Sequence, residues 1–161
     1  MCKKIFLLIV PLLFLAFAPK VSFSQCGPQL LTNAAEKIDD YTYVKDFKVR
    51  LKKARRRQPT PYLKNTIILN KGTRYRIFVA NAEEYDGELI FELYDRENII
   101  TSNFDNQTEK YYDGIEYDCM RTGAYTLVMY FSGGHEGCAA VIVAFEGNDV
   151  KRQRLADQKR F

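Results

Sequence analysis

The sequence predicts an all-β protein: an antiparallel β-sandwich of about eight short strands, preceded by one short helix. Apolar and polar residues alternate in one segment after another, which is the pattern of half-buried strands. Turn-forming residues separate these segments at the spacing typical of sandwiches. The 161 residues also include 11 Tyr and 11 Phe, and bulky aromatic side chains favour pleated, half-buried surfaces.

The first residues of the chain have the three parts of a secretory signal peptide. A positively charged start is followed by an apolar run over residues 5–18, and the small residues Ser22 and Ser24 precede a cleavage point. The run is short for a membrane span, which needs about 20 residues. We therefore expect residues 1–24 to be removed. The mature protein is expected in the periplasm, at the outer membrane or outside the cell, without a transmembrane span.

Lipidation at Cys26 is an alternative fate of the new N-terminus. Lipoprotein processing favours a small residue before the lipidated cysteine, whereas Gln25 is large and polar. Cleavage after Ser24 is therefore the preferred prediction.

Cleavage also removes most of the apparent positive charge. The whole chain has 24 Lys and Arg against 20 Asp and Glu, a net charge of +4. The first 24 residues contain three lysines and no acid, so 21 basic residues remain against 20 acidic ones. A nearly neutral exported protein is a poor candidate for nucleic-acid binding. Any cationic function must come from a local cluster.

The spacing of apolar residues predicts the helix and the strands of the mature chain. Pro28 and the apolar residues after it have helical spacing and predict an amphipathic helix over 28–39. Phe47, Val49 and Leu51 then alternate with basic residues, which predicts a half-buried strand. Residues 53–61 break regular structure. Further strands are expected over residues 66–69, 75–79, 89–93, 99–102, 115–119, 124–131 and 138–145, with a polar loop over 103–110. The prediction is one sandwich domain over residues 25–149 and a charged tail over 150–161.

Three motifs within about residues 65–145 resemble the bacterial pre-peptidase C-terminal domain. They are Leu69-Asn70-Lys71-Gly72-Thr73-Arg74-Tyr75, Leu93-Tyr94-Asp95 and Thr122-Gly123-Ala124-Tyr125. This resemblance implies a jelly-roll sandwich that serves secreted proteins as a binding or folding accessory. The helix and basic strand that precede the matching segment are additions to that pattern.

The strongest candidate for a binding surface is a basic cluster within residues 45–57. Its only acid is Asp46. Basic side chains on the outer face of a strand, continued by an arginine run, predict a site for an envelope protein or an anionic glycan. A solvated strand edge protected by lysines is the alternative. The cluster consists of Lys45, Lys48, Arg50, Lys52, Lys53, Arg55, Arg56 and Arg57.

Three cysteines follow the expected cleavage point, so one cannot pair within the chain. An oxidising compartment favours a disulfide. We slightly favour Cys119 with Cys138, which flank the strand expected over 124–131. Cys26 is the alternative partner for either of them, or is lipidated.

The sequence contains no catalytic or metal-binding pattern. His135 is the only histidine, whereas zinc sites draw on several ligands at ordered spacings. We therefore expect a non-enzymatic module of the bacterial envelope without a cofactor, which contacts a protein or an anionic glycan. The alternative is a small structural subunit of a larger outer-membrane or secretion-related complex, attached through the odd cysteine or the helix.

Overall fold

The computed structural model describes residues 26–38 and 40–147. In this part of the chain, eight strands form two four-stranded sheets in which every neighbouring pair is antiparallel. The predicted fold class is confirmed. The expected signal peptide (1–24) and charged tail (150–161) lie outside the described residues, and so do the ends of the expected domain at 25 and 149.

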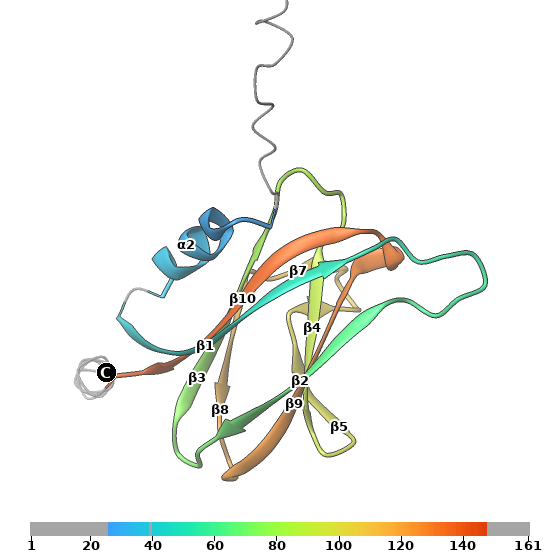
Figure 1. Cartoon of the computed structure of the whole chain (residues 1–161). Helices are drawn as coiled ribbons and strands as arrows, with labels where there is room; N and C mark the ends of the chain where they lie inside the picture. Colours follow the sequence, from blue (N-terminus) through green and yellow to red (C-terminus); the bar gives the residue numbers. More distant parts are fainter. Residues whose placement is uncertain (1–25, 39, 148–161) are drawn as a thin grey trace, which may run out of the picture.

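Each segment with predicted alternation forms a strand (Figure 1). In spatial order, sheet A consists of β1 (Tyr41–Leu51), β10 (Gly137–Glu146), β3 (Arg74–Asn81) and β8 (Gly114–Asp118). Sheet B consists of β2 (Tyr62–Leu69), β9 (Gly123–Phe131), β4 (Leu89–Asp95) and β5 (Asn98–Ser102). The remaining elements are the helix α2 (Pro28–Glu36), the short hairpin of β6 (Phe104–Asp105) and β7 (Lys110–Tyr111), and the 3-10 turn η1 (Ser132–Gly134).

The order of the strands is that of a jelly roll. Nearly every connection between successive main strands crosses from one sheet to the other, and only β4 and β5 form a hairpin within one sheet. This crossing places β1 and β2 at the edges of their sheets, with the first and last strands paired in sheet A. The arrangement matches the eight-stranded double-sheet jelly roll.

The main core lies between the two sheets and follows the predicted alternation. Along β9, Tyr125, Leu127, Met129 and Phe131 are buried while the residues between them are partly exposed. The inward residues of β1, β2, β3, β4 and β10 belong to the same cluster. Successive side chains of a strand point to opposite faces. Once one face is buried, the position of each residue therefore determines whether it points into the core or outward.

The outer face of sheet A is also buried, because α2 packs across β10 and β3 (Figure 1). Phe78 and Ala80 of β3 join Ile142 of β10 and Ala34 of the helix in a second apolar cluster. Simple alternation predicted only the inward residues of β3. The outward residues of β3 are buried as well, because the helix shields the outer face of the strand from water.

A buried asparagine fixes the segment that was predicted to be a polar loop. Asn103 is only 1% exposed. Its side-chain nitrogen donates to the carbonyl oxygens of Leu89 (2.9 Å) and Tyr112 (3.2 Å), and its side-chain oxygen accepts from the backbone N–H of Phe91 (2.7 Å). These bonds tie the β6–β7 excursion to the backbone of β4.

Candidate functional site

Of the three cations expected to form a ladder on the outer face of the strand, Lys48 and Arg50 lie on β1, whereas Lys52 follows its last residue. Phe47 and Val49 are buried in the core, whereas Lys48 and Arg50 are exposed. In the sheet register, Lys48 lies opposite Ala140 and Arg50 lies opposite Cys138. Opposite residues of an antiparallel pair share one face, so both cations lie on the outer face of sheet A, at its free edge.

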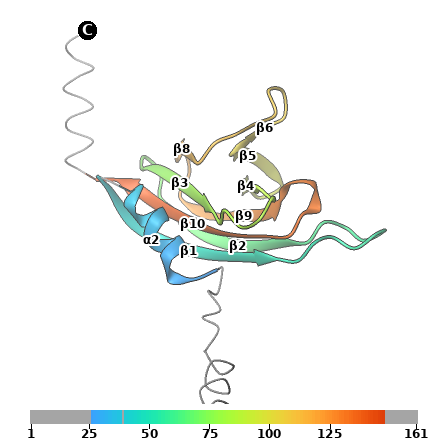
Figure 2. The ribbon, with the colours of Figure 1, turned by 90° about the horizontal axis from the view of Figure 1, so that it is seen from above.

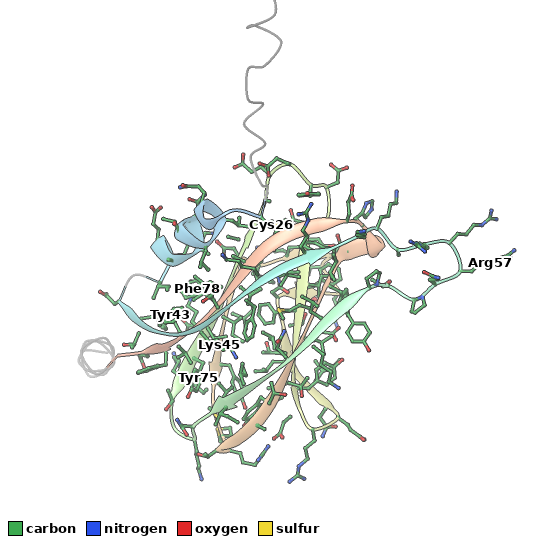
Figure 3. All side chains as sticks on the ribbon, in the orientation of Figure 1. Cys26, Tyr43, Lys45, Arg57, Tyr75 and Phe78 are labelled. Atoms are coloured by element: carbon green, nitrogen blue, oxygen red, sulfur yellow. A yellow bond between two sulfur atoms is a disulfide. The ribbon has the colours of Figure 1, made fainter. Side chains whose placement is uncertain are left out.

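Lys45 does not belong to this ladder. It lies opposite Val143, whose side chain is in the core between the sheets. Its ammonium group lies 5.2 Å from the centre of the Phe47 ring, at the inward side of the strand edge. Figure 3 shows Lys45 on the body of the sandwich, well away from Arg57. The predicted cluster of eight cations is therefore divided between two faces.

The remaining cations follow β1 into a loop that projects from the sandwich. Residues 52–61 extend beyond the ends of β1 and β2 in both ribbon views (Figures 1 and 2), and Arg57 lies at the tip (Figure 3). The base is anchored where the backbone N–H of Ala54 donates to Gly134 of η1 at 2.8 Å. The basic arm, as we call the outer ladder and this loop together, consists of Lys48, Arg50, Lys52, Lys53, Arg55, Arg56 and Arg57.

Four cations elsewhere in the described chain form ion pairs with acidic side chains, namely Lys37, Arg74, Arg76 and Arg121, whereas no cation of the basic arm does. Arg74 forms a paired contact with Asp118 at 2.7 and 2.6 Å, which raises the pKa of Arg74. Arg121 pairs with Asp95 and lowers the pKa of that carboxyl group. Lys37 pairs with Asp113 at 3.0 Å. None of the ion pairs within the described residues includes the arm, and every arm side chain is exposed.

Sequence reasoning missed a second feature, a groove on the outer face of sheet B. Tyr62 of β2 lies opposite Tyr130 of β9, and Thr126 of β9 lies opposite Tyr94 of β4. The three rings line an open groove of about 480 Å³, which we call the tyrosine groove. Outward-facing tyrosines in three strands were visible in the sequence, but only the strand order brings them together.

Two of these rings are held by one carboxylate. The hydroxyl groups of Tyr94 and Tyr130 donate to the two oxygens of Glu92 at 2.6 and 2.7 Å. The bond to Glu92 raises the pKa of Tyr94 to about 12. Desolvation and the same carboxylate raise the pKa of Tyr130 as well. Both hydroxyl groups therefore stay protonated at neutral pH.

The disulfide differs from the favoured prediction. Cys26 pairs with Cys138, with a Cα–Cα distance of 5.7 Å, and Cys119 is free and buried. The predicted Cys119–Cys138 pair is wrong because the two residues lie at opposite ends of β3. Cys119 bonds to the backbone of Thr73, before the strand, whereas Cys138 bonds to Ala82, after it. Eight residues of extended strand separate these ends by about 25 Å, far beyond disulfide reach.

The disulfide also bears on the alternative fates of the cysteines. A thioether-linked lipid on Cys26 would need the sulfur atom that is bonded to Cys138. Cys119 lies among core residues, where its thiol is 3.1 Å from the carbonyl oxygen of Arg121.

The described residues contain no group of three or more His, Cys, Asp and Glu side chains placed to hold a metal ion. Within the same residues, no helix is long and apolar enough to cross a membrane. His135 is exposed in the turn after η1.

Comparisons with known proteins identify no family for this chain. No protein-family model matches it, and no curated protein matches it. Among solved structures, it is similar to PliG of Aeromonas hydrophila, a periplasmic lysozyme inhibitor of g-type lysozyme. The TM-score is 0.47 and the sequence identity is 10%, over 65% of this chain and 87% of that chain. We draw no functional conclusion from a likeness at this level.

Proposed function

We propose that the protein is a non-catalytic, exported binding module of the bacterial envelope, which engages an anionic partner through the basic arm. The observation that carries this proposal is the concentration of exposed cations without ion-pair partners in one short segment, residues 48–57. Seven cations are held within one strand edge and one loop, and none of them has an ion-pair partner among the described residues. The partner is an acidic protein surface or an anionic glycan.

The chemistry of the arm suits such a partner. A guanidinium group donates two parallel hydrogen bonds to a carboxylate, phosphate or sulfate, and the arm has four arginines. Clustered cations on a projecting loop also attract an anionic surface before contact, which raises the association rate. Because the charges are exposed, this attraction weakens as the salt concentration rises.

Protection of the strand edge does not account for the whole arm. A lysine on an exposed edge prevents a second strand from pairing there, and Lys48 is placed to do this in β1. The cations after Leu51 lie beyond the end of the strand, however, where no edge needs protection. Five of the seven arm residues are in this loop, so a binding role explains them better.

The alternative is a structural subunit of a larger complex, for which the expected attachments are the odd cysteine or the helix. Cys26 and Cys138 are bonded to each other, Cys119 is buried, and the apolar residues of α2 pack on sheet A. The odd cysteine is therefore not accessible to a second protein, whereas the polar face of α2 is exposed.

A pair of charge-reversal variants tests the proposal. In the first, Arg56→Glu and Arg57→Glu change the arm. In the control, Lys71→Glu and Lys110→Glu make the same charge change at exposed sites outside it. The mature proteins are used to capture partners from native envelope extracts and are then eluted with salt. The arm variant should lose its partner, whereas the control should keep it. Equal retention, or equal loss, by the two variants would contradict a specific arm.

A further inference from the structure

We infer that the tyrosine groove binds a chain of acidic sugar residues, which continues from the groove onto the basic arm. This inference rests on the proposed function and names the ligand class of the same surface. The groove lies on the outer face of sheet B, opposite to the face of sheet A that α2 covers.

The size and the lining of the groove suit a saccharide. Its volume of about 480 Å³ is within the range of small-ligand sites. Tyr62 is 60% exposed, so its ring is accessible to a ligand. Aromatic rings pack against the C–H faces of sugars, and hydroxyl and charged groups nearby pair with the sugar hydroxyls. Thr60 and Thr126 supply such hydroxyl groups in the lining.

The groove is organised before a ligand arrives. Glu92 accepts a hydrogen bond from Tyr94 through one oxygen and from Tyr130 through the other. These bonds fix the positions of two rings from adjacent strands. Because the rings are already ordered, binding costs less side-chain entropy than it would with mobile rings.

The charged side chains that line the groove favour an acidic chain. Lys64 and Arg96 line it, with Glu97 as the only acid in the lining. Two of the lining residues, Thr60 and Tyr62, lie at the junction between the projecting loop and β2. A ligand that leaves the groove at Tyr62 therefore meets the loop with its five cations, so positive charge runs from the groove to the arm.

A saccharide fits this surface better than a peptide does. The backbone groups of β2, β9 and β4 that face one another are bonded within sheet B. A peptide lying on the face of the sheet would find few backbone partners, because strand addition occurs at an edge. A sugar chain needs ring faces and side-chain polar groups, and the groove presents these.

The test measures the affinity of the full mature protein for four probes by calorimetric titration. Two are acidic saccharides, tetragalacturonic acid and a sulfated heparin tetrasaccharide. The third is the methyl ester of the first, which keeps the rings and removes the charge, and the fourth is a tetraglutamate peptide. We expect an acidic saccharide to bind at least tenfold more tightly than either the ester or the peptide.

Variants then separate the groove from the arm. Tyr62→Ala removes an exposed ring of the groove and should weaken saccharide binding at least tenfold. Tyr43→Ala is the matched control, because this tyrosine is similarly exposed, at 52%, on β1. It should leave the affinity within about twofold of the parent, since surface substitutions away from a site change little.

Each other result overturns one of the two proposals. If the acidic probes bind and only the arm variant Arg56→Glu/Arg57→Glu loses affinity, the groove is not the site and the arm still stands. If the peptide binds as tightly as the saccharides and depends on Tyr62, the ligand class is wrong. If no acidic probe binds and native envelope yields no partner, both the saccharide ligand and the proposed function are wrong.

Discussion

Removal of the Cys26–Cys138 disulfide should cost a large part of the stability of the domain. The bond joins residues separated by 112 positions, so it constrains nearly the whole unfolded chain. For a loop of this length the chain-entropy relation gives about 4.8 kcal/mol, and measured losses for native disulfides are about 2–5 kcal/mol. We therefore expect the double variant Cys26→Ala/Cys138→Ala to lose about 3–5 kcal/mol of unfolding free energy.

The measurement is urea unfolding of the mature protein with and without a reducing agent. In a domain of this size, the expected loss corresponds to a fall of about 12–20 °C in the midpoint of thermal unfolding. The slope of free energy against urea should also rise, because the uncrosslinked chain exposes more surface when it unfolds. The control is Cys119→Ala, which keeps the disulfide and removes only a buried thiol. This variant should lose much less unfolding free energy than Cys26→Ala/Cys138→Ala.

Two outcomes would refute this reasoning. Thiol titration of the unreduced, unfolded mature protein should find one free thiol per chain, and three would show that the bond is absent. A larger loss in Cys119→Ala than in Cys26→Ala would show that Cys119, and not Cys26, is the partner of Cys138.

Two further predictions concern side chains that hold loops in place. Asn103→Ala should cost about 2–4 kcal/mol in urea unfolding, because it leaves buried backbone groups without partners, whereas the exposed Asn106→Ala should change little. Asp95 has a pKa below its usual value because Arg121 bonds to it, so its stabilising effect is present above the unfolded pKa of about 3.9 and is lost as the pH falls through the folded pKa. Thermal unfolding midpoints of the parent and Asp95→Asn should therefore differ at neutral pH and converge in acid. A constant difference down to about pH 2 would contradict this assignment of the pKa shift.

The strands could be predicted from the sequence because their signal is local. The alternation of Phe47 and Val49 with Lys48 and Arg50 depends only on one strand having one buried face. The same reasoning located the projecting loop, since proline and charged residues interrupt the pattern between β1 and β2. Lys45 was included in the predicted cluster although its parity with Phe47 puts it on the inner face, because the cluster was defined as all cations within residues 45–57.

The pairing of strands could not be predicted in this way, because it depends on contacts between distant segments. Cys119 and Cys138 flank β9 in sequence, yet the fold places them at opposite ends of β3. Tyr62, Tyr94 and Tyr130 form one surface only because the strand order is β2, β9, β4. Alternation indicates which side chains share a face of one strand but does not indicate which strand lies beside it.

The fold itself favours the surface formed by the groove and the arm. Strands that are buried on both faces have apolar residues at nearly every position, and β10 is buried along almost its whole length. Helix α2 and the Cys26–Cys138 disulfide therefore occupy the outer side of β10. In the described part of the chain, no helix covers the outer face of sheet B, which carries tyrosine, threonine and charged side chains over β2, β9 and β4. Because the loop after β1 leads directly into β2, the fold places its free cations at the end of that uncovered face.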